Sequence, residues 1–571
     1  MPLNIFRFRT KILSILLFLF ASVLGGKLFF VQVVNGEDYI AEAESQYIAP
    51  ASDIFNRGTI YFKEKTGNLV SAATLKSGFT LALVPSQITN AEEAYKKVNE
   101  IWPIDKEDFM AKVSKADDPY EEIGKRLPKE IGEQIEDLGI DGVRVYKDKW
   151  RFYPAEKIAS HALGFVAYKD NTLTGRYGLE QYYDEVLNRQ DKNLYVNFFA
   201  EVFSNISQSI FQGDKSREGD IILSIEPNVQ SFLESELVKL TEKWNSTSSG
   251  GIILNPKTGS IYAMSSLPSF DPNTFGKETD STVFSNPLIE YVYEMGSTIK
   301  PLTMAFALDS GAVTPTTEYY DKGYVDVSGY HITNYDGKGR GQVSMQEVLN
   351  QSLNTGVVFA MEKMGKDAFR DYMLSLEIGE ETGIDLPNEA LGLVRNLDTN
   401  IDVDFATASF GQGIAMTPMA TARALSVLAN GGYLVTPHLV EKIDYTVGLS
   451  KDMVYNKGHQ IIKPETSEEI TRMLVRVVDE ALVGGTVALD RYSVAAKTGT
   501  AQIADKKNGG YYNDRNLHSF FGYFPAYDPE FLVFLYTIYP KEVKYASYTL
   551  TDPFMNTAKF LLNYYEVPPD R

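Results

Sequence analysis

The longest apolar stretch of the chain lies close to its N-terminus. Residues 12–34 carry a single charged side chain, Lys27, and show no polar face. A helix of this length crosses the hydrocarbon core of a bilayer if the lysine amine extends toward the headgroups. Three basic residues precede the stretch and favour a cytoplasmic N-terminus. We therefore expect a cytoplasmic tail over residues 1–11, a plasma-membrane anchor over residues 12–34, and the rest of the chain outside the cytoplasm.

A cleaved signal peptide is the alternative interpretation of this stretch, because a basic start followed by a short apolar core is also typical of secretory leaders. A buried core helix is disfavoured because the stretch lacks a polar face. Both remaining interpretations place the later residues outside the cytoplasm.

Residues 35–215 mix short strands with charged helices. Apolar and polar positions alternate within residues 51–85 and predict β-structure, with a hairpin turn at Lys-Thr-Gly-Asn, residues 65–68. Amphipathic patterns predict helices over 91–102 and 129–140. Since no reactive side chains gather here, we expect a scaffold or interaction role for this region.

Residues 216–571 have the pattern of an α+β domain whose sheet combines segments that are distant in sequence. Two early strand-like runs are joined by a connector that contains Lys257-Thr258-Gly259, which predicts a turn between antiparallel strands. Helices are predicted over 301–311, 343–354 and 418–432, and late strands over 492–504, 519–526 and 530–540.

The composition is that of an ordinary globular protein, and 571 residues favour two or three domains. The formal net charge of -20 disfavours nucleic acid as a partner, because phosphate binding depends on clustered lysine and arginine. Cysteine is absent, and the five histidines show no metal-ligand spacing. We therefore predict no nucleic-acid partner, no metal site and no cofactor.

The segment EMGSTIKPLTMAF holds the only Ser-x-x-Lys pattern of the chain, at Ser297 and Lys300. If a helix begins here, these two residues share a face and the amine can reach the hydroxyl. A serine becomes a nucleophile when a base removes its proton, and a lysine acts as that base when burial or nearby positive charge lowers its pKa. Pro301 is tolerated in a first turn, so it holds the helix start close to Ser297. The alternative interpretation is an ordinary N-cap serine followed by a solvated lysine.

Two later motifs supply groups that such a centre needs. Ser352 and Asn354 offer a hydroxyl that can relay a proton and an amide that can hold a peptide group. Lys-Thr-Gly occurs three times, but at Lys65 and Lys257 it lies in predicted turns. At Lys497 it ends a strand-like run, where an ammonium, two hydroxyls and a glycine suit a substrate that carries a carboxylate.

STIK at 297–300, SLN at 352–354 and KTGT at 497–500, in this order, resemble the three motifs of penicillin-binding transpeptidases. More specifically, the chain resembles the class B, monofunctional penicillin-binding proteins of cell division and elongation. Stretches outside the motifs, such as GRYGLEQYYDEVLN at 175–188 and SFGQGIAMTPMA at 409–420, extend the resemblance over nearly the whole chain.

The resemblance implies an elongated, mostly β or mixed pedestal over 35–215, similar to a dimerisation domain. Residues 216–571 would form the transpeptidase domain, a β-lactamase-like fold in which a five-stranded antiparallel sheet packs with helices. One segment departs from the family pattern: Phe62 and Lys63 stand where aspartate and arginine are usual. This departure concerns the pedestal rather than the catalytic centre.

The resemblance also implies roles for single residues in peptidoglycan crosslinking. Ser297 would attack the penultimate D-alanine carbonyl of a stem peptide, and Lys300 would take its proton. Ser352 would pass a proton to the leaving amine, and Asn354 would bind the peptide amide. The same serine would be acylated by β-lactam antibiotics.

Further residues would bind the substrate or its oxyanion. The backbone N–H groups of Ser297 and Thr500 would form the oxyanion hole. Lys497 would recognise the terminal carboxylate and lower the pKa of Lys300. The other predicted substrate-binding residues are Thr498, Gly499, Gln412 and Gly413.

A polytopic membrane glycosyltransferase is the partner that the resemblance implies. Two other functions stay open: hydrolysis, as in a D,D-carboxypeptidase or β-lactamase, and a scaffold or β-lactam sensor that retains the fold. The whole-chain resemblance favours the transpeptidase over hydrolysis. A sensor needs a signalling module, for which the residues before the predicted anchor are too few.

Overall fold

The computed structural model describes residues 55–170, 172–189, 218–446, 448–505 and 509–571. They form two compact units: a smaller one over residues 75–150, and a larger one made of 57–74, 151–189 and 218–571. The predicted tail and anchor, residues 1–34, and the predicted domain boundary at 215–216 lie outside the described residues. No helix in the described part of the chain is both long and apolar enough to cross a membrane.

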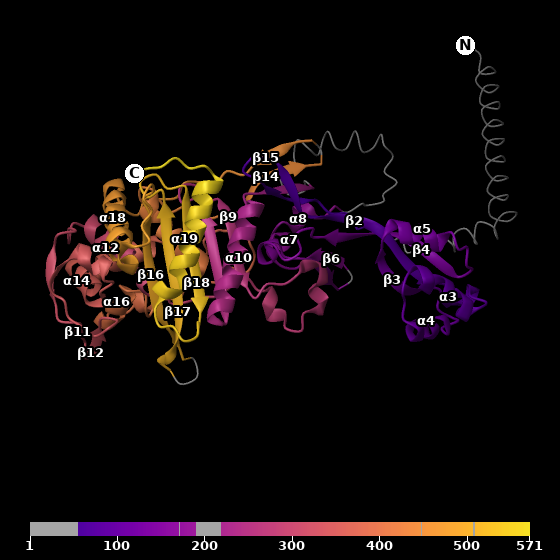
Figure 1. The fold of residues 1–571 in the computed structure, drawn as a ribbon, viewed down its shortest axis with the longest axis horizontal. Coiled ribbons are helices and arrows are strands. Elements are labelled where there is room, and N and C mark those ends of the chain that lie inside the picture. The colour runs from indigo at the N-terminus through magenta and orange to yellow at the C-terminus, as the bar shows by residue number, and fades with distance from the viewer. Residues whose placement is uncertain (1–54, 171, 190–217, 447, 506–508) are drawn as a thin grey trace, which may run out of the picture. The chain divides into compact units, whose positions relative to one another are not determined.

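The centre of the larger unit is a five-stranded antiparallel sheet with the strand order β16-β17-β18-β8-β9 (Figure 1). Strands from the two ends of the unit therefore form one sheet, as the sequence pattern predicts. Their bounds are β8 Ser248–Leu254, β9 Ile261–Leu267, β16 Ala495–Ala504, β17 Tyr511–Phe524 and β18 Phe531–Ile538.

Apolar side chains cover both faces of this sheet. On β18, Val533 and Leu535 belong to one core, whereas Phe534 and Tyr536 belong to another, because successive side chains of a strand point to opposite faces. The first core includes α10 (Pro227–Trp244) and α19 (Ala546–Tyr564), which lie side by side (Figure 1). The second includes α12 (Lys300–Asp309), α14 (Asn354–Met364) and α17 (Pro418–Ser426). The sheet is thus buried between two helical layers.

The three Lys-Thr-Gly sequences have the structures predicted for them. Lys257 lies in the turn between β8 and β9, and Lys65 lies in the turn between β1 (Ile60–Lys63) and β2 (Leu69–Leu83). Lys497 lies within β16, at the edge of the five-stranded sheet. Only the third sequence is therefore part of a strand.

A second sheet of the larger unit joins β1 to later parts of the chain. β1 pairs with the first residues of β2 and, in parallel, with β7 (Gly219–Leu223). β7 pairs with β14 (Val440–Tyr445), which pairs with β15 (Ser450–Asp452). The unusual Phe62 is buried in the core and Lys63 forms an ion pair with Glu441, so the hairpin accommodates both departures from the family pattern.

A buried ionic cluster fixes the segment that precedes this sheet. Glu180 forms ion pairs with Arg57 at 2.6 Å and with Arg151 at 2.5 Å, and Tyr153 donates a hydrogen bond to the same carboxylate. Burial opposes ionisation of Glu180, but the charges of Arg151 and Arg57 outweigh it and hold the pKa of the carboxyl below its ordinary value. Three sequence-distant segments are thereby connected within the larger unit.

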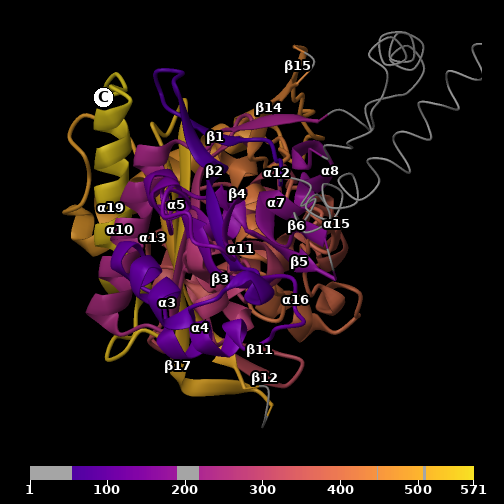
Figure 2. The same ribbon diagram turned by 90° about the vertical axis from the view of Figure 1, so that its right-hand side faces the viewer.

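The smaller unit combines strands with amphipathic helices around its own core (Figure 2). The later residues of β2 pair with β3 (Glu121–Leu127), and β4 (Val143–Phe152) also pairs with β2. Helices α3 (Ala91–Ile101) and α5 (Lys129–Glu136) confirm the two helices predicted from the pattern, and α4 (Lys106–Val113) was not predicted. Asn90 caps α3 by accepting a hydrogen bond from the N–H of Glu93.

The larger unit also contains further helices and strands. The helices are α6 Ser160–Leu163, α7 Gly178–Tyr182, α8 Asp184–Leu187, α11 Pro287–Glu290, α13 Met345–Asn350, α15 Lys366–Ser375, α16 Asp402–Ala408 and α18 Pro464–Arg476. The strands are β5 Val166–Lys169, β6 Thr172–Gly175, β10 Glu318–Asp321, β11 Tyr324–Val327, β12 Tyr330–Thr333 and β13 Gly341–Ser344. β10 pairs with β13 and β11 pairs with β12, so the β10–β13 segment is a pair of small antiparallel ladders before α13.

Candidate active site

Ser297 lies in a short 3₁₀ turn, Gly296–Thr298, which leads directly into α12. Pro301 occupies the first turn of α12, as predicted, where its missing N–H leaves no helical hydrogen bond unmade. Lys300 begins the helix and is buried, with 1% of its surface exposed, whereas Ser297 is half-buried. The sequence thus builds a helix start that buries the lysine and leaves the serine partly accessible.

Ser352 is the residue that both buried lysines contact. The amine of Lys300 donates to the Ser352 carbonyl at 2.5 Å and to its Oγ at 3.2 Å. The amine of Lys497 donates to the same Oγ at 2.9 Å and to the Thr498 carbonyl at 2.9 Å. Within the described residues, no hydrogen bond joins Lys300 to Ser297. The three motifs therefore meet at the Ser352 hydroxyl.

Burial of two amines side by side disfavours their charged forms. Burial lowers the pKa of Lys300 well below its ordinary value, and the positive charge of Lys497 lowers it further. Burial lowers the pKa of Lys497 to about 7. Both effects favour the neutral form of Lys300, and a neutral amine has a lone pair that accepts a proton.

Ser352 has a strained backbone. Its φ is 53°, in the left-handed region that residues other than glycine rarely adopt. Residues held in this region cost about 1–3 kcal/mol and cluster at functional sites. The turn between α13 and α14 directs the Ser352 hydroxyl to both lysines at this cost.

Asn354 begins α14, and its side-chain orientation is determined by a carbonyl. Its Nδ2 donates to the Thr333 carbonyl at 2.8 Å. Since a carbonyl only accepts, the amide nitrogen must face Thr333, and the amide oxygen is directed away from it. The half-buried Asn354 side chain can therefore accept a hydrogen bond from an N–H group of a ligand.

The strand β16 passes very close to the Ser297 turn. A Cβ added to Gly499 would lie 2.7 Å from the Met295 carbonyl oxygen and would also collide with the Ser519 hydroxyl. Ser519 on β17 donates to the same Met295 carbonyl at 2.8 Å. Gly499 is thus required for the close approach of β16 to the backbone that precedes Ser297.

Thr500 lies on β16 beside the same turn. Its Oγ1 accepts a hydrogen bond from the backbone N–H of Ala546, the first residue of α19, at 3.1 Å. The hydroxyl hydrogen of Thr500 is then available for an acceptor, such as a carboxylate oxygen. The edge strand β16 thus carries Thr498 and Thr500 as well as Lys497.

The predicted residues Gln412 and Gly413 lie in a loop that packs against the backbone just before Ser297. Gly411, which precedes them, accepts a hydrogen bond from the N–H of Gly296 at 3.1 Å. Gly413 donates its N–H to Glu294 at 3.2 Å, and Tyr511 donates to the same carboxylate. The loop therefore joins the wall of the site, and its contact is with the residues just before the nucleophile motif.

Two regions of the chain match family models. Residues 250–558 match the penicillin-binding protein transpeptidase domain, and residues 55–202 match the penicillin-binding protein dimerisation domain. The first match spans more than half of the chain and contains all three motifs. This chain is a member of the penicillin-binding protein family.

Curated relatives and solved structures agree with this membership. Stage V sporulation protein D of Bacillus subtilis is 32% identical over 93% of this chain and 82% of its own length. A peptidoglycan D,D-transpeptidase FtsI homolog of Mesostigma viride is 26% identical over 92% of this chain and 90% of its own. The crystal structure of penicillin-binding protein 3 of Mycobacterium tuberculosis complexed with aztreonam shares the fold, with a TM-score of 0.69 and 19% identity over 90% of this chain and 98% of that chain.

Several residues of the site of this penicillin-binding protein were not predicted from the sequence. Ser519 and Glu294 support the backbone around Ser297, and Thr333 orients Asn354. Glu294 lies three residues before Ser297, so its place beside the candidate nucleophile could have indicated a role in the site. Ser519 and Thr333 carried no signal, because their contacts depend on strand pairing and on a backbone carbonyl.

We expect Gly499→Ala to destabilise the protein by about 1–3 kcal/mol, because the new methyl group must push β16 away from Met295 and Ser519. The free energy of unfolding from denaturant titration measures this effect. Gly276→Ala is the matched control, since an added Cβ there meets no heavy atom within 4 Å. Equal stability of the two variants would contradict the close approach.

Proposed function

We propose that this penicillin-binding protein is a serine D,D-transpeptidase that crosslinks peptidoglycan stem peptides outside the cytoplasm. The observation that carries the proposal is the buried Lys300, held with Lys497 around the Ser352 hydroxyl at the start of the Ser297 helix. Burial and like charge lower the pKa of Lys300 and so favour the neutral amine that activation of a serine requires. Membership of the penicillin-binding protein family and the D,D-transpeptidase relative support the same reaction.

The first step forms an acyl-enzyme at Ser297. Lys300 accepts the hydroxyl proton while Oγ attacks the carbonyl carbon of the penultimate D-alanine. In its neutral form, Lys300 uses its two N–H groups as donors to Ser352, which leaves the lone pair for the serine proton. The backbone N–H groups of Ser297 and Thr500 stabilise the oxyanion, where loss of one donor typically costs about 3–4 kcal/mol.

Collapse of the tetrahedral intermediate breaks the bond to the terminal D-alanine. The leaving nitrogen needs a proton, which Ser352 relays from Lys300, because its hydroxyl touches both lysine amines. Terminal D-alanine leaves as a neutral amine, and Ser352 recovers its proton from Lys300. The amine of a second stem peptide then attacks the acyl-enzyme and forms the crosslink.

The β16 edge and Asn354 hold the donor peptide. Lys497, Thr498 and Thr500 bind the terminal carboxylate, and Gly499 allows the peptide backbone to approach the strand. The Asn354 oxygen accepts from the peptide N–H, consistent with the orientation that Thr333 imposes. Gln412 and Gly413 line the substrate side of the neighbouring loop.

β-Lactams acylate the same serine, because their strained amide presents a carbonyl to the nucleophile and a nearby anionic group takes the place of the terminal carboxylate. The M. tuberculosis structure with aztreonam supports this proposal for the shared fold.

We also propose that residues 12–34 anchor the protein in the plasma membrane and that a polytopic glycosyltransferase is its partner in cell division or elongation. The apolar sequence of that segment supports the anchor.

A labelling experiment tests the nucleophile. We expect fluorescent penicillin to label the protein covalently and Ser297→Ala to reduce labelling to background, because the other hydroxyl of this turn, on Thr298, is fully buried and donates to the Met295 carbonyl. Ser310→Ala, an exposed serine just after α12, is the control and should keep normal labelling. Normal labelling of Ser297→Ala would overturn the assignment.

A product assay separates the three functions that the sequence leaves open. The protein is incubated with a donor peptide that ends in D-alanyl-D-alanine and with an acceptor amine. We expect a crosslinked product and free D-alanine in equal amounts. Only trimmed peptide would indicate a D,D-carboxypeptidase, and no turnover despite penicillin labelling would indicate a scaffold or sensor.

The pH dependence of acylation reports on Lys300. Acylation needs the neutral amine, so its rate should rise as the pH passes through a Lys300 pKa that burial and the Lys497 charge hold well below the ordinary value. Lys497→Gln removes that charge, so the pKa of Lys300 should rise. The ascending limb of the plot of acylation rate against pH should then move to higher pH. Penicillin acylation rates measured across the pH range test this prediction.

Lys257→Gln is the matched control, because Lys257 belongs to the Lys-Thr-Gly sequence in the β8–β9 turn. Its ascending limb should coincide with that of the unmodified protein. An unchanged limb in Lys497→Gln would show that the Lys497 charge does not control Lys300.

A further inference from the structure

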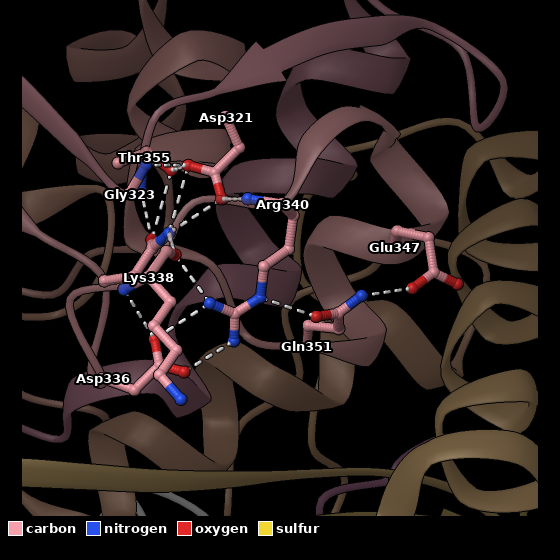
Figure 3. Close-up of polar contacts among 9 residues, drawn as sticks. Asp321, Gly323, Asp336, Lys338, Arg340, Glu347, Gln351 and Thr355 are labelled. Carbon is pink, nitrogen blue, oxygen red and sulfur yellow. Dashed lines mark hydrogen bonds and ion pairs between the residues drawn. The ribbon is translucent and has the colours of Figure 1, made fainter.

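A buried carboxylate, Asp321, lies at the end of β10, and 1% of its surface is exposed (Figure 3). Its Oδ1 accepts hydrogen bonds from the Gly323 N–H at 2.9 Å, the Asn334 amide at 3.1 Å and the Thr355 hydroxyl at 2.8 Å. Its Oδ2 accepts from the Asn334 amide at 3.0 Å and from the backbone N–H of Arg340 at 3.0 Å. Both carboxylate oxygens are thus surrounded by donors.

This arrangement requires both terminal atoms of the side chain at position 321 to be hydrogen-bond acceptors. An asparagine at position 321 has the same shape but directs an N–H₂ group at donors on one side, which leaves buried donors without partners. Each such group costs about 1–3 kcal/mol. The network therefore distinguishes aspartate from its amide, although no part of the Asp321 side chain touches the proposed reaction centre.

One arm of the network leads to Asn354. Thr355 follows Asn354 directly, and besides its bond to Asp321 it donates its backbone N–H to the Asn334 amide oxygen at 3.3 Å. Asn334 follows Thr333, whose carbonyl orients the Asn354 amide. Asp321 therefore fixes residues on both sides of the Asn354–Thr333 hydrogen bond.

A second arm leads to Ser352. The Arg340 guanidinium donates to the Gln351 side chain at 2.9 Å, and Gln351 immediately precedes Ser352 (Figure 3). Asp336 holds the same guanidinium through two bonds of 2.9 Å, and the Arg340 N–H bonds to Asp321. The β10–β13 segment thus forms hydrogen bonds with the residues on both sides of the Ser352-Leu353-Asn354 turn.

The turn needs such support because its backbone is strained. Ser352 has a φ of 53°, and its hydroxyl must face the amines of Lys300 and Lys497 at hydrogen-bonding distance. A strained residue persists only when its surroundings over-determine it. The two arms end on the residues immediately before and after this turn, Gln351 and Thr355.

We propose that Asp321 is a positioning residue for acylation: through Thr355, Asn334 and Arg340 it holds the Ser352-Leu353-Asn354 turn in the geometry that the reaction uses. The proposal rests on the proposed acyl transfer at Ser297. Displacement of a reacting group by about 1 Å can cost 100-fold in rate. Loss of the Asp321 acceptors should therefore slow chemistry more than it weakens binding.

The experiment compares Asp321→Asn with Asp385→Asn in the full-length protein. Asp385 is also buried, with 3% of its surface exposed, and it accepts bonds from the backbone N–H groups of Leu439 and Val440 and from the Tyr183 hydroxyl. The same substitution therefore removes similar hydrogen bonds outside the β10–β13 segment. Both variants should have lower unfolding temperatures.

The readouts are the acylation rate constant and the dissociation constant of the non-covalent penicillin complex, normalised to the fraction of protein that can be labelled. We expect Asp321→Asn to lower the rate constant about 10- to 100-fold with a smaller change in the dissociation constant. Asp385→Asn should acylate at the normal rate. A normal rate constant for Asp321→Asn, or an equal loss in both variants, would overturn the proposal.

Thr355 provides a second pair of variants if Asp321→Asn fails to fold. Thr355→Val removes the hydroxyl at nearly constant volume and should slow acylation about fivefold, as expected for one lost hydrogen bond. Thr355→Ser keeps the hydroxyl and should restore the rate. Equal rates for the two variants would overturn the proposal, whereas absence of labelling in the unmodified protein would instead contradict the proposed function.

Discussion

The site of this penicillin-binding protein depends on the burial of two lysine amines against one serine hydroxyl. Water stabilises an ammonium strongly, so two amines removed from water beside each other cannot both keep their charge at low cost. Lys300 and Lys497 are both buried and share the Ser352 Oγ, so burial and the Lys497 charge lower the pKa of Lys300 well below its ordinary value. Burial and the nearby positive charge of Lys497 thereby favour the basic, neutral form of a residue that is ordinarily charged.

That burial in turn requires backbone segments to approach one another closely. β16 can lie against the Ser297 turn because Gly499 has no side chain, and the hydroxyls of Ser519 and Thr298 both donate to the Met295 carbonyl at this contact. The sheet contributes rigidity, since β16 is held along its length by β17 and the core lies on both faces. The reacting groups therefore stand on elements with little freedom to move apart.

The turn around Ser352 is different, because it belongs to no sheet and carries backbone strain. Its neighbours are held by a polar network whose centre is a buried carboxylate, and polar networks of this kind stabilise one geometry only when every member is satisfied. Asp321 meets that condition through donors from Gly323, Asn334, Arg340 and Thr355. The site therefore depends on three features: the burial of the two lysines, the close contact at Gly499 and the network around Asp321. They act on separate segments that meet near the Ser352 hydroxyl.

Much of this organisation could be predicted from local pattern. The hairpin turns at Lys65 and Lys257, the strand at Lys497 and the start of α12 just after Ser297 all follow from residues within a few positions of each other. The order of the three motifs was enough to indicate the family. The paired ladders of the β10–β13 segment and the helix α19 were not predicted, and neither was the network around Asp321.

The sequence by itself determined many of the segments that become strands and helices and which residue types are available for acyl transfer, because those properties depend on local periodicity and side-chain chemistry. The tertiary structure alone decided that Lys300 bonds to Ser352 rather than to Ser297, and that Asp321 lies beside Thr355. Such contacts join residues tens of positions apart, so they depend on the path of the chain between them. Burial and the nearby Lys497 charge, which lower the pKa of Lys300, exist only once that path is fixed.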